Sequence, residues 1–332
     1  MSGYFLGVDV GATKTHALLA DASGRALGFG EAGPGNPFHV GHDGLRQAIA
    51  SAMEQALRGA SLAKTRIGSA GFGIAGYNWP SEHPALSRSV QALGLSAPVR
   101  IVNDAIVGLL AGAPAGWGIG LVAGTHCNCR GWDRGRREGR VVGFRMGEAA
   151  GAKTLVEQAV YTVARQYTHR GPPTSLTEAF LSATGAGGLD DLLEGLTSGR
   201  YALTGAAAPI VFAEAERGDP VAMNLVRWAG RELASLAAGV ARQLGLEEAA
   251  FDLVLAGSLF KGSPRLVDAV QEAVYPVAPH ARLITLKAPA VVGGVLLAME
   301  DVAFERERVH EALVASGLAL AVAGSTPRGV NR

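Results

Sequence analysis

A short stretch near the start of the chain combines residue types that can bind a phosphorylated ligand. It contains the acid Asp9, the turn glycine Gly11, the hydroxyl of Thr13 and the cation Lys14. Glycine lets the backbone approach a ligand and turn N–H groups toward it, and a carboxylate can hold Mg²⁺, usually through water. These residues predict either a phosphate-binding turn or a hairpin turn without a ligand. They do not form a P-loop, because the G-x-x-x-x-G-K-[ST] pattern is absent and a strand, not a helix, is expected next.

Two more polar positions lie where ligands commonly bind. Asp104 follows a β-branched segment at 99–102 that resembles a short strand, and it precedes a helix expected at 105–112. It could cap that helix, or act as a general base at the carboxyl end of a strand, where α/β sheets place ligands. Asn36 lies in a glycine- and proline-rich loop at 31–39. Its amide can exchange hydrogen bonds with sugar hydroxyls, although by itself a structural turn asparagine is the simpler interpretation.

The elements that must position these residues follow one plan twice. Alternating apolar runs and glycine turns predict a three-stranded meander at 4–30 and a second one at 117–144. Each meander is followed by buried strands that lead into a glycine turn or a small-residue helix. These segments are 67–78 and 99–112 in the first half, and 251–262 and 281–298 in the second. The internal duplication predicts a fold made of two similar halves.

The domain organisation follows from this repeat. We expect an N-terminal lobe at 1–114, joined by a C-terminal helix at 303–320, and a C-terminal lobe at 115–302. The second lobe contains a long helical insert at 153–246. The segment at 321–332, which ends in glycine, serine and proline, is expected to be disordered.

Composition sets further bounds. The chain has 332 residues, of which 48% are hydrophobic and 18% charged, so it can build a sizeable core and is not a disordered chain. A net charge of +1 gives no reason to expect a nucleic-acid partner or an anionic membrane. No apolar run reaches the ~20 residues of a membrane span, and no signal peptide opens the chain. We therefore expect a cytoplasmic protein.

The two cysteines are Cys127 and Cys129, within a segment expected to be a strand. They are too close together to staple a fold, which fits a reducing compartment. Residues two apart on a strand point the same way, so with His126 they could approach a metal. Two thiols and one imidazole fall short of the four ligands of a structural zinc site. We expect buried thiols.

Taken together and in this order, the motifs resemble those of the N-acetylglucosamine kinase/BadF-type ATPase family, within the superfamily of sugar kinases, actin and chaperone ATPases. The resemblance extends from residue 6 to about residue 298. Several separated motifs in the right order are more specific than any one of them. They are Asp9-x-Gly11-x-Thr13-Lys14-Thr15, Asn103-Asp104-Ala105, Ala123-Gly124-Thr125-x-x-Asn128-Cys129-Arg130 and Ala256-Gly257-Ser258-Leu259.

The resemblance implies an α/β, duplicated ribonuclease H-like fold of the actin/hexokinase type, with ATP in a cleft between two lobes. It also implies Mg²⁺ held near Asp9, a homodimer, and Asp104 as the base that accepts the proton of the attacking sugar hydroxyl. The remaining implied contacts are Gly11, Thr13, Lys14, Gly124 and Thr125 with the phosphates, Gly257 and Ser258 with the adenosine, and Asn36 and Asn128 with the sugar.

One segment departs from the family pattern. Members of the family carry a Gly-Trp-Gly…Gly-Asp-Glu-Gly-Ser run after the second phosphate motif, whereas the segment at 141–151 lacks the tryptophan. Glu148 replaces the usual aspartate, Ala149 replaces the usual glutamate, and His126-Cys127 replaces a small Gly-Ser pair. Glu148 could still hold sugar hydroxyls, or it could be a solvated or capping carboxylate. The resemblance thus implies ATP binding more strongly than it implies N-acetylglucosamine as the substrate.

The function that these observations favour is ATP-dependent phosphorylation of a sugar or amino sugar. The main alternative is a BadF-type ATPase that acts as an activator or conformational switch without a sugar acceptor. Some such relatives hold an iron–sulfur cluster, but a cysteine pair within a core strand is poorly placed for one. A non-catalytic nucleotide- or sugar-binding regulator is a third alternative, and the presence of Asp104 counts against it.

Overall fold

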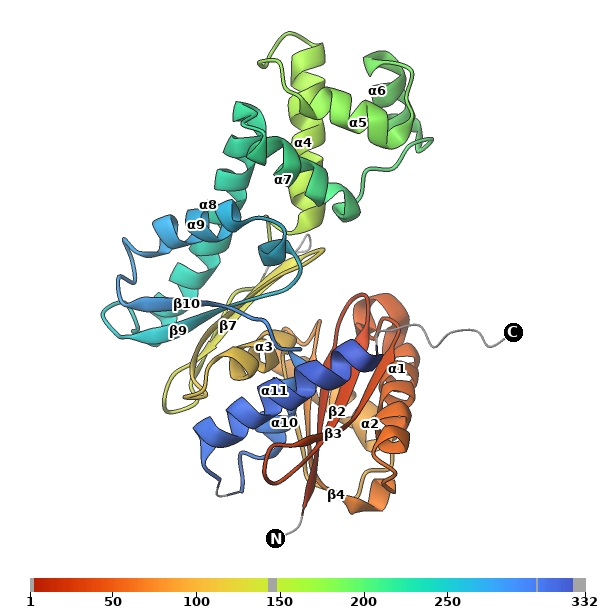
Figure 1. The fold of residues 1–332 in the computed structure, drawn as a ribbon, viewed down its shortest axis with the longest axis vertical. Coiled ribbons are helices and arrows are strands. Elements are labelled where there is room, and N and C mark those ends of the chain that lie inside the picture. Colours follow the sequence, from red (N-terminus) through yellow and green to blue (C-terminus); the bar gives the residue numbers. More distant parts are fainter. Residues whose placement is uncertain (1–2, 143–147, 303, 325–332) are drawn as a thin grey trace.

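The computed structural model describes residues 3–142, 148–302 and 304–324. Its strands form two five-stranded sheets with the orders β3-β2-β1-β4-β5 and β10-β9-β6-β7-β8. Figure 1 shows the two sheets one above the other along the length of the molecule. The strands are β1 Tyr4–Val10, β2 Thr15–Asp21, β3 Ala26–Ala32, β4 Ile67–Ile74, β5 Val99–Val102, β6 Gly118–Ala123, β7 Cys127–Trp132, β8 Glu138–Arg140, β9 Phe251–Ala256 and β10 Ala281–Thr285.

Both sheets are built in the same way. In the first sheet β1 pairs antiparallel with β2 and parallel with β4, and in the second β6 pairs antiparallel with β7 and parallel with β9. Each sheet is therefore a three-stranded meander extended by two parallel strands. The duplicated plan predicted from the sequence is confirmed.

Helices cover both sheets and form the insert of the second half. In Figure 1 the insert, with α4 to α7, makes up the end of the molecule farthest from the first sheet. The helices are α1 Pro37–Gly59, α2 His83–Gln91, α3 Asp104–Gly112, α4 Ala152–Tyr167, α5 Leu176–Thr184, α6 Leu189–Ser198, α7 Ala208–Glu216, α8 Pro220–Leu244, α9 Pro264–Val274, α10 Val291–Ala298 and α11 Arg306–Gly324. No helix in the described ranges is long and apolar enough to cross a membrane.

The last helix of each half packs on the sheet of the other half. Helix α3 lies against β6, β7 and β9, whereas α10 lies against β1, β2 and β4, and the two helices contact each other. Helix α11 packs on β3, as Figure 1 shows. The lobe boundary predicted at 114/115 follows the order of the chain, and it remains a prediction because α3 and α10 each join the opposite sheet.

Several element ends differ from the sequence expectation. Helix α1 begins at Pro37, inside the loop expected at 31–39, because Asn36 caps it and proline is favoured in the first turn. Gly41, with φ of 67°, interrupts that helix locally. Helix α11 continues to Gly324, because alanine and leucine favour helix up to that glycine. The disordered tail expected at 321–332 is therefore wrong for residues 321–324, and the remainder lies outside the described residues.

The main core lies between the second sheet and the helical insert. Cys127 and Cys129 are buried in this core with side chains of α4, α7 and α8. Because side chains alternate along a strand, Asn128 and Arg130 point to the opposite face of β7. That face turns toward the first half of the chain, where the contacts described next are made.

Candidate functional site

Two acids from the first half meet at the carboxyl ends of its parallel strands. Asp9 lies in β1, and Asp104 is the first residue of α3, two positions after the end of β5; both are half-buried. Burial, followed by the negative charge of Asp104, raises the pKa of Asp9 to about 7, against the opposing charge of Lys14. Burial also raises the pKa of Asp104, and a hydrogen bond from Asn128 opposes that shift. The fold thus holds two carboxylates in one site that disfavours their charge.

Asn128 connects these acids to the second sheet. Its side-chain Nδ2 donates to Oδ1 of Asn103 at 2.8 Å and lies 3.4 Å from Oδ1 of Asp104. Asn103, not Asp104, is the N-cap of α3, because its Oδ1 accepts a hydrogen bond from the backbone N–H of Ala105 at 3.0 Å. The backbone N–H of Ala105 is shared, since Oδ1 of Asp104 also accepts from it at 3.0 Å, and Asn103 holds the N-cap position itself. The structure brings Asp104 and Asn128 together, as the motifs imply.

Arg130 is a site residue to which sequence reasoning gave no role. Its side chain is only 1% exposed, and Nη1 lies 2.9 Å from Oε1 of Glu138. Nη2 donates to the carbonyl oxygen of Tyr77 at 3.2 Å and lies 3.3 Å from Oδ1 of Asn78, both in the loop after β4. The available signal was the i, i+2 spacing that places Arg130 on the same face of β7 as Asn128.

Asn36 lies beside the same loop. Its Oδ1 accepts from the backbone N–H of Phe38 at 3.0 Å and caps α1. A Cβ atom at Gly76 would come within 2.7 Å of that oxygen, so the turn after β4 runs directly past Asn36. The structure thus places Asn36 next to the loop that holds Arg130. Its cap bond is the structural alternative to sugar binding, and the amide nitrogen is the group that this bond does not use.

The first glycine turn is tight and open to solvent on one side. The backbone N–H of Gly11 donates to the carbonyl of Lys14 at 2.9 Å, and Thr13 and Lys14 are exposed. The ammonium group of Lys14 lies 3.5 Å from Glu31, which also contacts His16. In this structure the charge of Lys14 is therefore directed toward the neighbouring strand β3.

The second glycine turn and the turn after β9 lie side by side. Helix α4 begins against the second turn, because the N–H groups of Ala152 and Lys153 donate to the carbonyls of Gly124 and Thr125 at 2.8 and 3.1 Å. Gly257 has φ of 106°, and a Cβ there would lie 2.2 Å from the carbonyl oxygen at the end of β6. This close approach brings Gly257 and the exposed Ser258 next to Gly124. Apart from its two chain neighbours, no described residue has an atom within 4 Å of where a Cβ of Gly124 would stand, so a ligand can approach that backbone.

Glu148 lies on the other side of β7. The thiol of Cys127, which points into the core, lies 3.0 Å from the carbonyl oxygen of Ala149 and 3.4 Å from that of Glu148. Burial and the nearby carboxylate of Glu232 on α8 raise the pKa of Glu148. The structure thus places its backbone at the core face of the strand, opposite Asn128. Residues 143–147 lie outside the described residues, so only the two ends of the altered segment at 141–151 are seen.

The thiols are buried as expected. Burial raises the pKa of Cys127 to about 12 and raises that of Cys129 as well. Over the described part of the chain, no group of three or more His, Cys, Asp or Glu side chains could hold a metal ion. A metal at Asp9 would therefore need ligands from water or phosphate, which is how Mg²⁺ is commonly bound at nucleotide sites.

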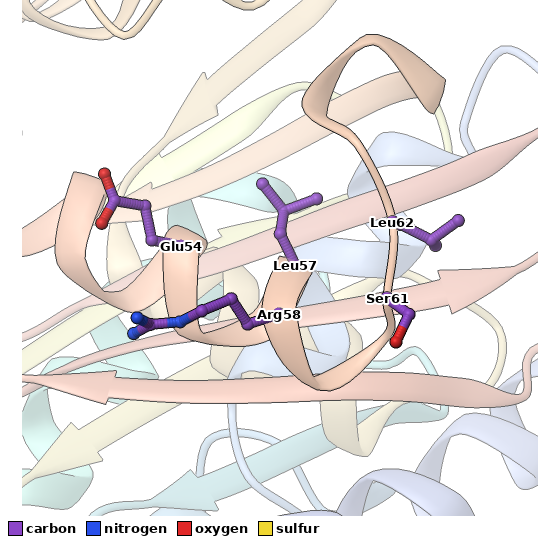
Figure 2. A pocket seen from close by; sticks show the side chains of 5 residues that line it. All are labelled: Glu54, Leu57, Arg58, Ser61 and Leu62. Carbon is purple, nitrogen blue, oxygen red and sulfur yellow. The ribbon is translucent and has the colours of Figure 1, made fainter.

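Two surface depressions among the described residues contain none of the predicted site residues. One, of about 650 Å³, lies at the end of α1 and is shown in Figure 2, where Leu57 lies between the charged Glu54 and Arg58 on one side and Ser61 and Leu62 on the other. The other, of about 190 Å³, lies between α8 and α9. The concentration of polar contacts around Asp104, not cavity size, marks the candidate site.

Two similar five-stranded sheets, each followed by a helix that packs on the other, define the two-lobed actin/hexokinase class of fold. Within that class, residues 6–298 match the BadF/BadG/BcrA/BcrD ATPase family, and the chain belongs to this family. Membership in a family of ATPases implies that the protein binds ATP. The fold class predicted from the sequence is confirmed.

Relatives and solved structures agree with this placement. The chain is 26% identical over 312 residues to an N-acetyl-D-glucosamine kinase of Dictyostelium discoideum, covering 90% of this chain and 98% of that protein. A candidate N-acetylglucosamine kinase structure from Chromobacterium violaceum has a TM-score of 0.68 at 25% identity, over 89% of this chain and 99% of that one. A ROK family glucokinase from Streptomyces griseus, solved with glucose and AMPPNP, shares the fold, with a TM-score of 0.57 at 20% identity over 89% and 98%.

Proposed function

We propose that the protein transfers the terminal phosphoryl group of ATP to a hydroxyl group of a sugar or amino sugar. The observation that carries this proposal is the position of Asp104. It is a half-buried carboxylate in the first turn of α3, after the N-cap Asn103, and Asn128 of the opposite sheet contacts it. The similarity to N-acetylglucosamine kinases supports the substrate class.

In this mechanism Asp104 accepts the proton of the attacking hydroxyl as the hydroxyl oxygen bonds to phosphorus. The base must be ionised to do so. Burial raises the pKa of Asp104, while the hydrogen bond from Asn128 and the positive charge of Arg130 lower it. Asn128 and Asn36 have amide groups that could orient sugar hydroxyls, which makes positioning the main contribution of these residues. Glu148 remains a further candidate for a sugar contact.

The residues present also fit Mg·ATP. Asp9 and Asp104 form a carboxylate pair that a divalent cation would neutralise, and Asp9 would hold the ion. When bound, Mg²⁺ neutralises charge on the phosphate oxygens. The turns at Gly11–Lys14 and Gly124–Thr125 would bind phosphates, and the adjacent Gly257-Ser258 turn would lie under the adenosine.

The test is ADP release from Mg·ATP with a panel of acceptors: glucosamine, N-acetylglucosamine, N-acetylmannosamine, N-acetylmuramic acid, glucose and no sugar. We expect one sugar to stimulate turnover strongly. Asp104→Asn should then lower kcat by ~10²–10⁴-fold, the usual contribution of a general base. Asp43→Asn is a matched control, because Asp43 is 81% exposed on α1 and should leave turnover unchanged.

Two results would contradict the proposal. Full kinase activity in Asp104→Asn would exclude Asp104 as the base. ATP turnover that no sugar alters would instead indicate an ATPase of this family without a sugar acceptor.

A further inference from the structure

Arg130 is a charged residue removed from solvent on the site face of β7. Only 1% of its side chain is exposed, its ion-pair partner Glu138 is 38% exposed, and its Nε has no hydrogen-bond partner within the described residues. A buried arginine with an unpaired donor is costly, and a well-packed apolar side chain is often at least as stable. The presence of Arg130 is better explained by its contacts with the loop after β4 than by a contribution to stability.

Arg130 holds one corner of a closed ring of hydrogen bonds. The carbonyl oxygen of Tyr77 accepts from Nη2 of Arg130 at 3.2 Å and from Nδ2 of Asn103 at 3.0 Å. Oδ1 of Asn103 accepts from Nδ2 of Asn128 at 2.8 Å, and Asn128 lies two residues from Arg130 on the same strand face. The ring thus returns to β7 after passing through the loop after β4 and the first turn of α3.

This ring fixes the surroundings of Asp104 from both sheets. Asn103 precedes Asp104 and caps its helix, while Asn128 donates to both residues. Removing the arginine fork would leave the Tyr77 carbonyl with Asn103 as its remaining side-chain donor and would remove the guanidinium contact of Asn78. A guanidinium can make these contacts with fixed relative geometry, which a lysine ammonium cannot reproduce.

We propose that Arg130 is a positioning residue that, paired with Glu138, fixes the loop after β4 against the start of α3 and so sets the orientation of Asp104 and Asn128. The effect of Arg130 on phosphoryl transfer rests on the proposed function. The effect of Arg130 on the loop after β4 is independent of that function.

The first experiment compares steady-state kinetics of Arg130→Met, Arg130→Lys and the control Arg137→Met. Arg137 belongs to the same hairpin and forms an ion pair with Asp133, but its side chain is largely exposed. We expect Arg130→Met to lower kcat by ~10²-fold, the loss typical of misplaced catalytic groups, with KM for ATP changed by less than about 3-fold. Arg130→Lys should recover only part of kcat, and Arg137→Met should match the wild type. A loss in Arg130→Met no larger than that in Arg137→Met would overturn the inference.

The second experiment needs no activity. Amide hydrogen exchange should become faster at 77–79 and 104–106 in Arg130→Met and remain unchanged in the Gly11–Lys14 turn. Faster exchange throughout the chain would show a merely structural role and contradict the proposal. If Arg130→Met does not fold, Glu138→Gln replaces it, because Glu138 is partly exposed, and the same local pattern is expected at smaller size. If the wild type shows no sugar-dependent turnover, the proposed function fails, and this exchange pattern alone decides the role of Arg130.

Discussion

Asp9 and Asp104 illustrate, at the scale of single residues, a conflict between folding and binding. Each carboxylate is partly removed from water, and each lies in the electrostatic field of the other. Such a pair costs folding free energy whenever both groups are ionised, and a bound cation would remove that cost. The stability of the ligand-free protein should therefore fall as pH rises and Asp9 ionises.

Asp9→Asn should stabilise the ligand-free protein at pH 8. The folded-state pKa of Asp9 is about 7, against an ordinary value of 3.8, so the folded state binds its proton more tightly than the unfolded state does. The free energy of unfolding therefore falls as pH rises from about 4 to 7. Above pH 7 it stays lower by the full amount that the difference between the two pKa values of Asp9 sets. Each pH unit in this range lowers the free energy of unfolding by about 1.4 kcal/mol, so Asp9→Asn should raise the free energy of unfolding at pH 8 by at most about 4 kcal/mol.

Thermal unfolding between pH 4 and 8, without nucleotide or Mg²⁺, measures this gain. It should become small toward pH 4, where Asp9 is protonated in the folded state and close to half protonated in the unfolded state. Asp43→Asn, on an exposed site, serves as the control. A gain that stays constant across this range, or a loss at pH 8, would show that Asp9 is not ionising against its surroundings.

The sequence predicted some residues of this site and not others, for a physical reason. The resemblance to the family implied that Asp104 and Asn128 share one site, and the structure brings the two side chains together. The contact of Arg130 with the carbonyl of Tyr77 was not predicted, because it is made to backbone atoms that carry no side-chain signal and lie 53 positions away in the chain. The direction of Lys14 toward Glu31 was missed because it depends on which side chains face each other across β2 and β3.

Close helix contacts dominate at the scale of elements. Small residues in β1, β4, α3 and α10 let these elements approach to backbone distance. A Cβ at Gly293 in α10 would lie 1.9 Å from the carbonyl oxygen of Val107 in α3, and one at Gly71 would lie 2.3 Å from the carbonyl of Gly294. The crossing of α3 and α10 therefore requires glycine at 293, and the packing of α10 on β4 requires glycine at 71.

Gly293→Ala should lower the free energy of unfolding by about 3 kcal/mol, because the added methyl group must push α3 and α10 apart. The matched control is Gly239→Ala in α8, where no described residue outside the adjoining helix backbone has an atom within 4 Å of the new Cβ. That substitution should raise stability by about 0.5–1 kcal/mol, since alanine loses less backbone entropy in a helix. Urea unfolding at pH 7 measures both. Equal effects of the two substitutions would mean that the helix crossing tolerates a wider separation.

The sequence largely predicted that these strands and helices exist, but it did not predict which sheet each helix packs on. Small-residue runs indicated buried strands and helices at 67–76 and 281–298, as observed. Nothing in the periodicity of α10 indicates that it packs on β1 and β4 and not on the neighbouring strand β10. The packing of each of these helices on the sheet of the other half depends on surfaces that form only when both sheets are assembled.

At the scale of the whole molecule, one carboxylate joins the segments that connect the two halves. Glu300 follows α10 and accepts hydrogen bonds from Arg136 in the β7–β8 turn at 2.7 Å and from Arg306 at the start of α11 at 2.7 Å. Arg136 also donates to the carbonyl of Gly116, in the segment between α3 and β6. A Cβ at Gly116 would lie 2.4 Å from the Arg306 guanidinium. Both connections between the sheets thus meet at Glu300, which is a feature that no local sequence motif could indicate.

Glu300→Gln should therefore weaken the joint between the halves. The neutral amide would leave two guanidinium groups facing each other with only one acceptor, in a place where the glutamate side chain is 15% exposed. Charged hydrogen bonds in partly buried sites each contribute about 1.5–3 kcal/mol, so we expect a loss of about 1–3 kcal/mol in the free energy of unfolding. Asp43→Asn breaks an exposed ion pair on α1 and should change stability by less than about 0.5 kcal/mol. Urea unfolding of both variants, with amide exchange at Gly116 and in the first turn of α11, distinguishes a loosened joint from a general loss of stability. Exchange that rises only elsewhere would mean that Glu300 stabilises its own helix end and not the connection between the two sheets.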